Sequence, residues 1–254
     1  MKLSIIIVHY NTLDLLKKCL SSIYGQAFSF QYEVFVIDNA SENFEGIEFN
    51  FPLAKIIRNK SNLGFARANN LGLKSAVGEY ILFLNPDTEI LKGSLEKMLE
   101  FLAINPDVGV LGPKLVYPDG SLQLSCRRFY TLRAILMRRV IFLSRLFNRK
   151  ILVEHLMLDS SESIKDADWL IAACIMFPKR VLEKLGGFDE KYRLYFEDVD
   201  LCYRIKKEGL RVVYYPESKI IHHHRRDSAK GLSRKTIWHI LSAVRFFRKY
   251  GWSF

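Results

Sequence analysis

The sequence predicts an α/β fold, with a mostly parallel central sheet flanked by helices in a single domain. Through the first 112 residues, apolar stretches rich in β-branched residues alternate with amphipathic stretches, at the spacing of strand–helix–strand units. Several apolar stretches end in short polar tips, and open α/β sheets bind their ligands at the carboxyl ends of their strands. No repeat or low-complexity linker interrupts the chain, which favours one continuous domain over two.

The elements expected from this pattern can be placed by residue. The strands are Ile5–Val8, Tyr32–Asp38, Leu53–Arg58, Glu79–Leu84 and Val108–Leu111, and the helices are Asp14–Tyr24, Phe65–Ala76 and Ile90–Ala103. Pro86 ends the fourth strand, because proline has no N–H to donate to a sheet. Asp87 is therefore expected at the carboxyl end of a buried strand, where it is either a ligand of a divalent cation or a helix cap.

Composition restricts the class of protein. A chain of 254 residues with 49% hydrophobic residues can bury a sizeable core, which excludes a disordered protein. The longest uncharged apolar run, Trp169 to Phe177, is about half the length of a membrane span, and the apolar N-terminal run is too short for a signal peptide. The four cysteines are scattered without a CxxC pair, so neither structural zinc nor a disulfide framework is expected. These observations predict a cytoplasmic protein.

The net charge of +11 is unevenly distributed along the chain. Residues 127–150 contain eight basic residues and no acidic one, and residues 203–254 contain thirteen basic and three acidic residues. A basic surface of this kind indicates an anionic partner. The candidates are the phosphates of a small substrate, an anionic membrane surface and nucleic acid. The segment 127–150 is amphipathic at helical spacing, so it is either an ordinary solvated helix or an interfacial helix on anionic headgroups.

A late acidic cluster is the second candidate for chemistry. Glu197, Asp198 and Asp200 place three carboxylates within four residues. Like charges so close together raise one pKa toward the operating pH, which is the property of a general base. Acidic residues are also common at helix N-termini, and Glu197 and Asp200 could have that role alone.

Taken in order, the motifs of this chain resemble those of the bacterial inverting glycosyltransferases of family 2. They are Tyr-Asn after the first strand, Asp-Asn-Ala-Ser at 38–41, Asn-Leu-Gly-Phe-Ala at 62–66, Asn-Pro-Asp at 85–87, Gly-Gly-Phe-Asp-Glu at 186–190, Glu-Asp-Val-Asp-Leu-Cys-Tyr-Arg at 197–204, and a late histidine. The resemblance covers about residues 3–228, and the ordered set is specific although each motif alone is weak. Asn-Pro-Asp-Thr together with Glu-Asp-x-Asp-Leu-Cys is most similar to the rhamnosyltransferase branch.

The resemblance implies a domain organisation. A single GT-A-type, Rossmann-like domain is expected over residues 1–228, with a nucleotide-sugar-binding half at 1–112 and an acceptor and catalytic half at 113–228. A C-terminal helical extension is expected at 229–254.

The resemblance also implies roles for individual residues. Asp198 is the expected catalytic base. The residues expected to bind the donor are Tyr10, Asp38, Asn39, Gly64, Arg67, Asn70 and Asp87, and those expected to bind the acceptor are Trp169, Asp189 and Glu197. A divalent cation, Mg²⁺ or Mn²⁺, is expected on Asp87 and His223, with His222 and His224 as near-equal alternatives to His223. Asn85 stands in place of the first aspartate of the family's DxD motif.

The implied reaction is the transfer of a sugar, rhamnose from dTDP-rhamnose, to a lipid-linked or polysaccharide acceptor in cell-envelope or O-antigen-type biosynthesis. A UDP-sugar-dependent transferase of the same fold is the alternative, and the expected location includes a peripheral one on the inner face of the cell membrane. A basic nucleic-acid-binding protein is the alternative from another class, but no helix-turn-helix, zinc finger or RNP motif supports it, so no nucleic acid partner is expected. A nucleotidyltransferase would need a glycine-rich, lysine-bearing loop after the first strand, where His9-Tyr10-Asn11-Thr12 stands.

Overall fold

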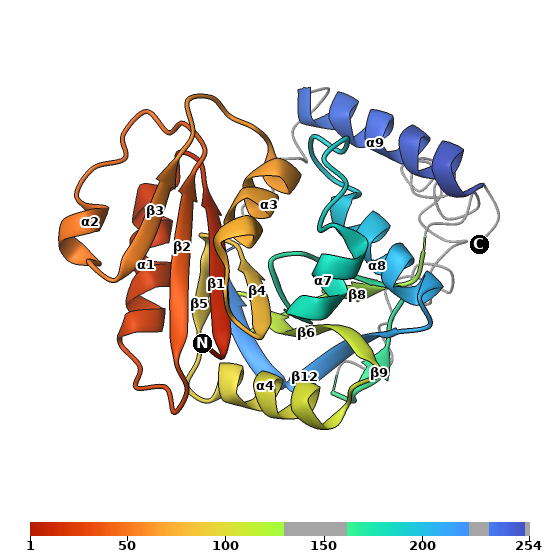
Figure 1. Ribbon diagram of the computed structural model, residues 1–254, viewed down its shortest axis with the longest axis horizontal. Helices are drawn as coiled ribbons and strands as arrows, with labels where there is room; N and C mark the ends of the chain where they lie inside the picture. Colours follow the sequence, from red (N-terminus) through yellow and green to blue (C-terminus); the bar gives the residue numbers. More distant parts are fainter. Residues whose placement is uncertain (130–161, 224–233, 252–254) are drawn as a thin grey trace.

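A computed structural model describes residues 1–129, 162–223 and 234–251, which form a mixed β-sheet covered by helices on both faces (Figure 1). The strands are β1 (Leu3–His9), β2 (Tyr32–Asp38), β3 (Ala54–Arg58), β4 (Tyr80–Leu84), β5 (Thr88–Ile90), β6 (Val108–Val116), β7 (Leu122–Gln123), β8 (Cys126–Arg127), β9 (Lys165–Asp166), β10 (Trp169–Leu170), β11 (Cys174–Pro178) and β12 (Arg211–His222). The helices are α1 (Leu13–Tyr24), α2 (Ile47–Asn50), α3 (Phe65–Ser75), α4 (Ser94–Ile104), α7 (Lys179–Leu185), α8 (Glu197–Lys207) and α9 (Arg234–Tyr250). The main sheet has the order β3-β2-β1-β4-β11-β6-β12-β5.

The first half of the chain forms the parallel part of the sheet. β1 lies between β2 and β4 and is parallel to both, and β3 is parallel to β2. Residues of β1 and β4 are buried almost without interruption, as expected for strands with helices on both faces. Because parallel strands end at the same edge, the polar tips after β1, β2 and β4 lie along one side of the sheet (Figure 1).

The second half of the chain brings another strand end to this edge. β11 is antiparallel to both β4 and β6, so β4 and β6 run in the same direction. β12 is parallel to β6 and ends at His222. The carboxyl end of β12 therefore meets the same edge as that of β4, although well over a hundred residues separate them in sequence.

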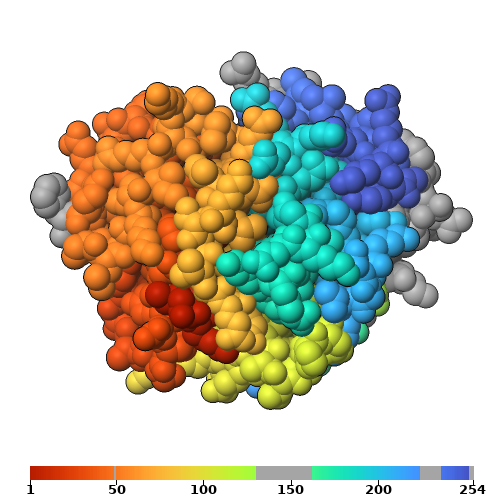
Figure 2. Space-filling view, viewed as in Figure 1, coloured from red at the N-terminus to blue at the C-terminus, as the bar shows by residue number. Residues whose placement is uncertain are grey.

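Two layers of helices bury two apolar cores against the sheet. α1 and α4 cover one face, where alternate β1 residues such as Ile5 and Ile7 are buried with them. α3, α7, α8 and α9 cover the other face, where Ile6 is buried. This alternation follows from the two-residue period of a strand. In Figure 2, α9 (blue) lies at the surface against the cyan segment that precedes α8.

The structure confirms the alternating strands and helices and corrects some of their bounds. The helix predicted over Ile90–Ala103 begins only at Ser94, after Gly93 with its positive φ of 79°. Ile90 itself is the last residue of β5 and is paired with Ile220 of β12. The strand predicted over Val108–Leu111 continues to Val116 as β6. Most of the basic segment 127–150 lies outside the described residues.

Candidate active site

Asp87 and His222 come together at the carboxyl edge of the sheet. Asp87 follows β4, and His222 is the last residue of β12. Nε2 of His222 lies 3.4 Å from Oδ1 of Asp87. The His222 side chain is buried, whereas Asp87 is partly exposed. Carboxylate oxygen and imidazole nitrogen are both ligands that Mn²⁺ and related cations accept.

Gln123 fixes the orientation of the His222 ring. Its Nε2 donates to the His222 carbonyl oxygen at 2.6 Å, which turns its Oε1 toward ring Nδ1 at 2.8 Å. Because an amide oxygen only accepts, Nδ1 carries the proton, and in the neutral ring Nε2 directs a lone pair toward Asp87. Two electron-pair donors 3.4 Å apart suit a cation between them. Among the described residues, no group of three or more His, Cys, Asp or Glu side chains could hold a metal ion, so Asp87 and His222 are a pair of possible ligands and not a complete site.

The consecutive histidines point to different places. Nε2 of His223 contacts the carboxylate of Glu89, while the His223 backbone N–H donates to the carbonyl oxygen of Asp87 at 2.8 Å. Neighbouring residues at a strand end face opposite sides, so His222 and His223 do not both reach one ion easily. His224 lies outside the described residues. The geometry therefore favours His222, one of the named alternatives, over His223 as the metal ligand.

Tyr10 and Asp38 lie at the carboxyl ends of β1 and β2, which are neighbouring strands in the sheet. Tyr10 is 47% exposed, so its ring is available to stack on a flat group of a ligand. Asp38 is buried, and its Oδ1 accepts the N–H of Ser41 at 3.2 Å. The N–H of Asn11, a residue with a φ of 52°, donates to the Ser41 hydroxyl at 3.0 Å. These bonds tie the two tips into one surface.

Asn39 organises the next part of the edge from inside the protein. Its Oδ1 accepts the side-chain N–H of Asn59 at 3.1 Å and the backbone N–H of Leu63 at 2.9 Å. Its Nδ2 donates to Oδ1 of Asn62 at 2.9 Å. The Asn39 side chain is only 2% exposed, so it holds the segment before α3 in place. A bound donor would contact that segment and not the Asn39 side chain itself.

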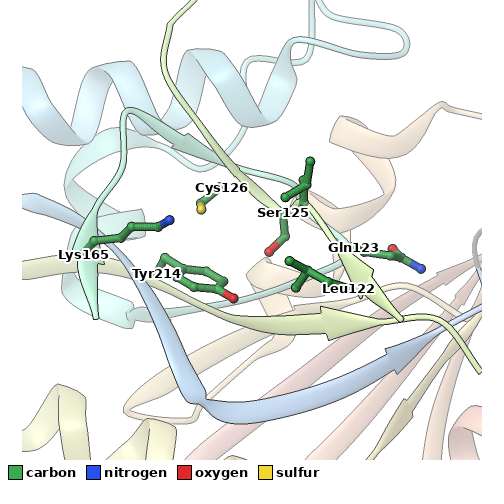
Figure 3. Close-up of a pocket in the computed structure, with 7 residues that line it drawn as sticks. Leu122, Gln123, Ser125, Cys126, Lys165 and Tyr214 are labelled. Atoms are coloured by element: carbon green, nitrogen blue, oxygen red, sulfur yellow. The ribbon is translucent and has the colours of Figure 1, made fainter. Parts of the chain in front are cut away.

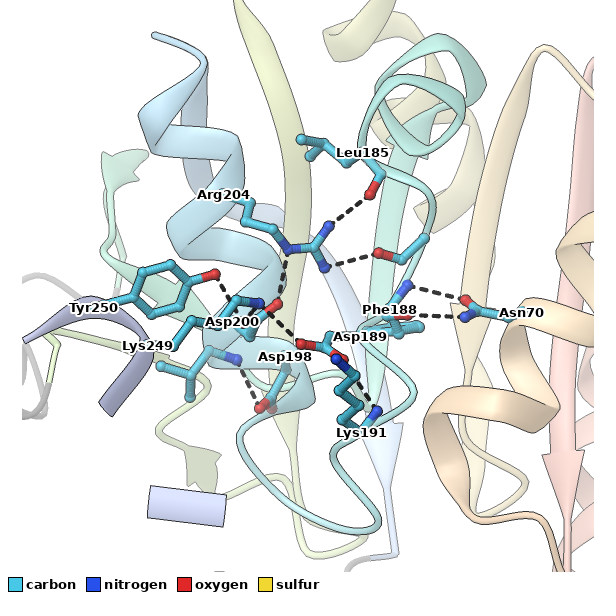
Figure 4. Close-up of polar contacts among 12 residues, drawn as sticks. Asn70, Leu185, Phe188, Asp189, Lys191, Asp198, Asp200, Arg204, Lys249 and Tyr250 are labelled. Carbon is cyan, nitrogen blue, oxygen red and sulfur yellow. Dashed lines mark hydrogen bonds and ion pairs between the residues drawn. The ribbon is translucent and has the colours of Figure 1, made fainter. Parts of the chain in front are cut away.

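The start of α3 fits against the chain segment that leads to α8. Gly64 has a φ of 83°, and a Cβ added there would lie 2.8 Å from the carbonyl oxygen of Arg193. The Asn70 amide exchanges two hydrogen bonds of 2.9 Å with the backbone of Phe188 (Figure 4). Nε of Arg67 lies 3.6 Å from Oε2 of Glu190, and both side chains are exposed. Gly64 and Asn70 therefore join the two halves of the site, and Arg67 remains accessible to a ligand.

Glu197 and Asp198 begin α8 and differ in environment. Oδ1 of Asp198 accepts the N–H of Val199 at 2.9 Å, and Oδ2 accepts the N–H of Ala172 at 3.4 Å. Burial, opposed by these hydrogen bonds, raises the pKa of Asp198 to about 6. Burial and the neighbouring charge of Asp198 raise the pKa of Glu197 well above its ordinary value. Asp198 is therefore ionised near neutral pH, while burial and the charge of Asp198 both favour the protonated form of Glu197.

A short backbone bridge connects Asp198 with the tip of β4. Ala172 donates its N–H to Asp198, and the carbonyl oxygen of the next residue, Ala173, accepts the N–H of Asn85 at 2.8 Å. Asn85 lies two residues before Asp87. The proposed base and the Asp87–His222 pair are thus joined through the residues just before β11.

Asp200 has a structural role distinct from that of Asp198. It is fully buried, and Nε of Arg204 donates to its Oδ2 at 2.7 Å. The other guanidinium nitrogens of Arg204 donate to the carbonyl oxygens of Leu185 and Gly187, each at 2.8 Å. These contacts fasten α8 to the Gly-Gly segment (Figure 4).

The three residues expected to bind the acceptor are not equally accessible. Trp169 is 5% exposed, and its indole Nε1 donates to the carbonyl oxygen of Arg128 at 3.0 Å. Glu197 is 6% exposed. Oδ2 of Asp189 is paired with Nζ of Lys249 at 2.9 Å. Their contact with an acceptor stays a prediction, and Trp169 is the least suited to it.

The sequence did not predict that Gln123 orients a site residue or that α9 contacts the segment before α8. Gln123 is 99 positions from His222, and its one sequence signal is a polar side chain between Leu122 and Leu124. Gln123 also lines a narrow pocket with Leu122, Leu124, Ser125, Cys126, Lys165 and Tyr214 (Figure 3). None of these lining residues belongs to the site predicted from sequence, so the predicted site is the sheet edge and not this pocket.

Comparison with known families decides the assignment. The family model described as "Glycosyl transferase family 2" matches residues 4–165. The chain belongs to this family. The resemblance found in the sequence is confirmed, and the protein is a glycosyltransferase.

Several curated relatives are similar over most of this chain. The O-antigen biosynthesis protein RfbC of Myxococcus xanthus is 30% identical over 87% of this chain, which spans 17% of that protein's length. The N-acetylglucosaminyl-diphospho-decaprenol L-rhamnosyltransferase of Mycobacterium tuberculosis is 29% identical over 80% of this chain and 70% of its own length. Rhamnosyltransferase WbbL of Escherichia coli is 26% identical over 96% of this chain and 92% of its own length.

Solved structures confirm the GT-A-type fold. GalNAc-T7 with UDP, GalNAc and Mn²⁺ superposes with a TM-score of 0.69 at 16% identity, over 96% of this chain and 48% of its own. The mannosyltransferase PcManGT of Pyrobaculum calidifontis, in complex with GDP-Man and Mn²⁺, has a TM-score of 0.65 at 20% identity, over 98% of this chain and 63% of its own. At these identities the likeness concerns the fold alone.

Proposed function

We propose that this glycosyltransferase inverts the anomeric centre of its donor and uses Asp198 as the catalytic base. The observation that carries the proposal is the Ala172–Ala173 bridge, which joins a half-buried carboxylate with a pKa of about 6 to the tip that carries Asp87. A base with such a pKa is ionised at neutral pH and still accepts a proton readily. An inverting transfer needs this base on the acceptor side and positive charge on the diphosphate side.

The reaction follows from these positions. Asp198 takes the proton of an acceptor hydroxyl while that oxygen forms a bond to the anomeric carbon of the donor. The bond from the anomeric carbon to the diphosphate oxygen breaks, and the nucleoside diphosphate leaves with the electron pair. Asp87 and His222 would hold a divalent cation, which supplies positive charge that stabilises the leaving diphosphate. The exposed Tyr10 ring is the surface proposed for the nucleobase, and Arg67 is a further cation near the donor.

The donor and acceptor are proposed from the relatives. Two of the relatives described above are named rhamnosyltransferases, and one of these names specifies a diphospho-decaprenol acceptor. We infer that this protein transfers rhamnose from dTDP-rhamnose to a lipid-linked or polysaccharide acceptor in cell-envelope glycan synthesis. A UDP-sugar donor is the alternative, because a structural neighbour binds UDP-GlcNAc.

Purified protein tests this proposal directly. It would be incubated with Mn²⁺, a prenyl-diphosphate-linked N-acetylglucosamine acceptor and, in parallel, dTDP-rhamnose, UDP-glucose, UDP-N-acetylglucosamine and GDP-mannose. Mass spectrometry should detect a deoxyhexose added from dTDP-rhamnose, and NMR should show an anomer opposite to that of the donor. Transfer from a UDP-sugar alone would establish the alternative donor, and a product that retains the donor anomer would contradict the role of Asp198.

We propose further that the protein lies peripherally on an anionic membrane surface, on its inner face. Among the described helices, none is long and apolar enough to cross a bilayer. α9 has an exposed apolar ridge, with Ile237 54%, Ile240 37% and Leu241 60% exposed. Its sequence contains no acidic residue and four basic residues besides Lys249, whose Nζ is paired with Asp189 and Asp200, and this composition suits anionic headgroups. The four cysteines are buried and unpaired, as is usual in a reducing compartment.

Vesicle sedimentation tests the membrane surface. The protein should sediment with phosphatidylglycerol-containing vesicles and much less with phosphatidylcholine vesicles, and higher salt should weaken binding because it screens the charges. Changing Ile237 and Leu241 together to serine should reduce binding. The matched control is Ile104→Ser, since Ile104 is 79% exposed at the end of α4. Equal sedimentation of all three proteins would exclude the α9 ridge as the membrane contact.

A further inference from the structure

The turn that precedes Asp198 has an unfavourable backbone conformation. Tyr195 and Phe196 each have a φ of 66°, in the left-handed region that residues with a side chain rarely adopt. They are consecutive, and the next two residues are Glu197 and Asp198. The direction in which Asp198 leaves the backbone depends on this turn, so other contacts must hold it.

The inner face of α9 supplies contacts to this turn. The His239 ring lies edge-on against both aromatic rings, with centroid distances of 5.2 Å to Tyr195 and 5.5 Å to Phe196. The hydroxyl of Ser242 donates to the carbonyl oxygen of Leu194 at 3.0 Å, directly before the turn. α9 therefore contacts the side chains of the turn and the backbone directly before it.

The end of α9 holds the chain on both sides of the same turn. Nζ of Lys249 pairs with Oδ2 of Asp189 at 2.9 Å and with Oδ1 of the fully buried Asp200 at 2.7 Å (Figure 4). The hydroxyl of Tyr250 donates to the same oxygen of Asp200 at 2.9 Å. Asp189 precedes the turn and Asp200 follows Asp198, so the segment 189–200 is fixed at both ends and in the middle.

We propose that α9 is a positioning element for the catalytic carboxylate, with His239 and Ser242 as positioning residues that hold the turn before Asp198. The family model ends at residue 165, so it covers neither α9 nor this turn. The proposal rests on the proposed role of Asp198 as the base. Its consequence is that loss of the α9 contacts lowers the rate of transfer far more than it weakens the binding of the donor nucleotide. Tyr10, Asp38 and Asp87 lie on other elements, and Gly64, Arg67 and Asn70 contact the segment only at 188–193, before the turn.

The test compares His239→Ala/Ser242→Ala with Val244→Ala, a half-buried residue of the same helix. The double variant should lower kcat by at least tenfold, while the Kd for dTDP, measured by calorimetry, changes less than twofold. His239→Phe, which keeps an aromatic ring against Tyr195 and Phe196, should retain most of the activity. Val244→Ala should match the parent protein in both measurements.

Hydrogen exchange of residues 188–200 gives a readout that does not depend on the sugar donor. The double variant should lose protection in this segment and keep it in β1 and β4, which also shows that the fold survives. Unchanged exchange and unchanged kcat in the double variant would overturn the proposal, as would a parallel loss of dTDP affinity. If the parent protein transferred no sugar while exchange changed as expected, the proposed function would fail and the positioning by α9 would stand.

Discussion

At the scale of single residues, two neighbouring carboxylates acquire different properties from their surroundings. Glu197 and Asp198 are adjacent in sequence, and their closeness predicts only that one of them has a raised pKa, while the family resemblance implies that Asp198 is the base. The structure shows Asp198 with two backbone N–H donors, which oppose the effect of burial on its pKa, whereas the charge of Asp198 adds to the effect of burial on the pKa of Glu197. This distinction could not be predicted, because one donor, Ala172, lies 26 residues earlier in the chain.

The raised pKa of Asp198 predicts a pH dependence of stability. Burial raises its pKa from an ordinary value of 3.8 to about 6, so the folded protein binds this proton more tightly than the unfolded chain. Stability from this group is complete below pH 3.8 and is lost as pH rises through 6. Relative to Asp198→Asn, the parent protein should lose about 1–3 kcal/mol of unfolding free energy between pH 4 and pH 7.5. Urea titrations of both proteins at both pH values measure this loss. If the parent and Asp198→Asn differed in unfolding free energy by the same amount at both pH values, the raised pKa of Asp198 would be contradicted.

The Asp87–His222 pair predicts which substitutions remove a divalent cation. Titration of Mn²⁺ in the presence of dTDP, followed by electron paramagnetic resonance, should show binding to the parent protein. Asp87→Ala and His222→Ala should each weaken it by at least tenfold, because each removes one ligand. His223→Ala is the matched control and should bind nearly as the parent does, since its ring contacts Glu89. The reverse order for the two histidines would restore His223 as the ligand.

At the scale of elements, local sequence predicted the strands and helices of the first half well. β1, α1, β2, α3 and β4 each carry their own apolar period and their own ends, such as Gly78 and Pro86. The predicted start of the helix at Ile90 was wrong, because Ile90 fits an apolar helix face and a strand equally well. Its partner in β12, Ile220, is 130 residues away and decides the outcome.

The start of α3 offers a prediction at this scale. Gly64→Ala should destabilise the protein by about 2–4 kcal/mol, because it combines the cost of a backbone conformation almost restricted to glycine with a Cβ 2.8 Å from the Arg193 carbonyl oxygen. Gly93→Ala is the control, since Gly93 has a similar φ of 79° and no atom within 4 Å of the added Cβ. It should cost only about 1–2 kcal/mol. Thermal unfolding compares the two, and equal losses would show that the approach of Arg193 is not tight.

At the scale of the whole molecule, the site is assembled from segments that the sequence separates. The family motifs predicted Asp87, Asp198 and the late histidines as site residues, but not that Gln123 orients the His222 ring or that α9 contacts the turn before Asp198. Motifs mark residue types in order along the chain. Orientation comes from pairings such as β12 with β6 and α9 with 189–200, which no local pattern contains.

The proposed mechanism depends most on Asp198 as the base that activates the acceptor. The direct measurement is the pH dependence of kcat/KM for sugar transfer by the parent protein, with Asp198→Asn and Glu197→Gln assayed beside it. The parent rate should fall as pH decreases below about 6, where Asp198 becomes protonated. Asp198→Asn should be slower by about 10²–10⁴-fold and still bind dTDP normally. A nearly active Asp198→Asn, or an inactive Glu197→Gln beside it, would contradict the assignment of the base.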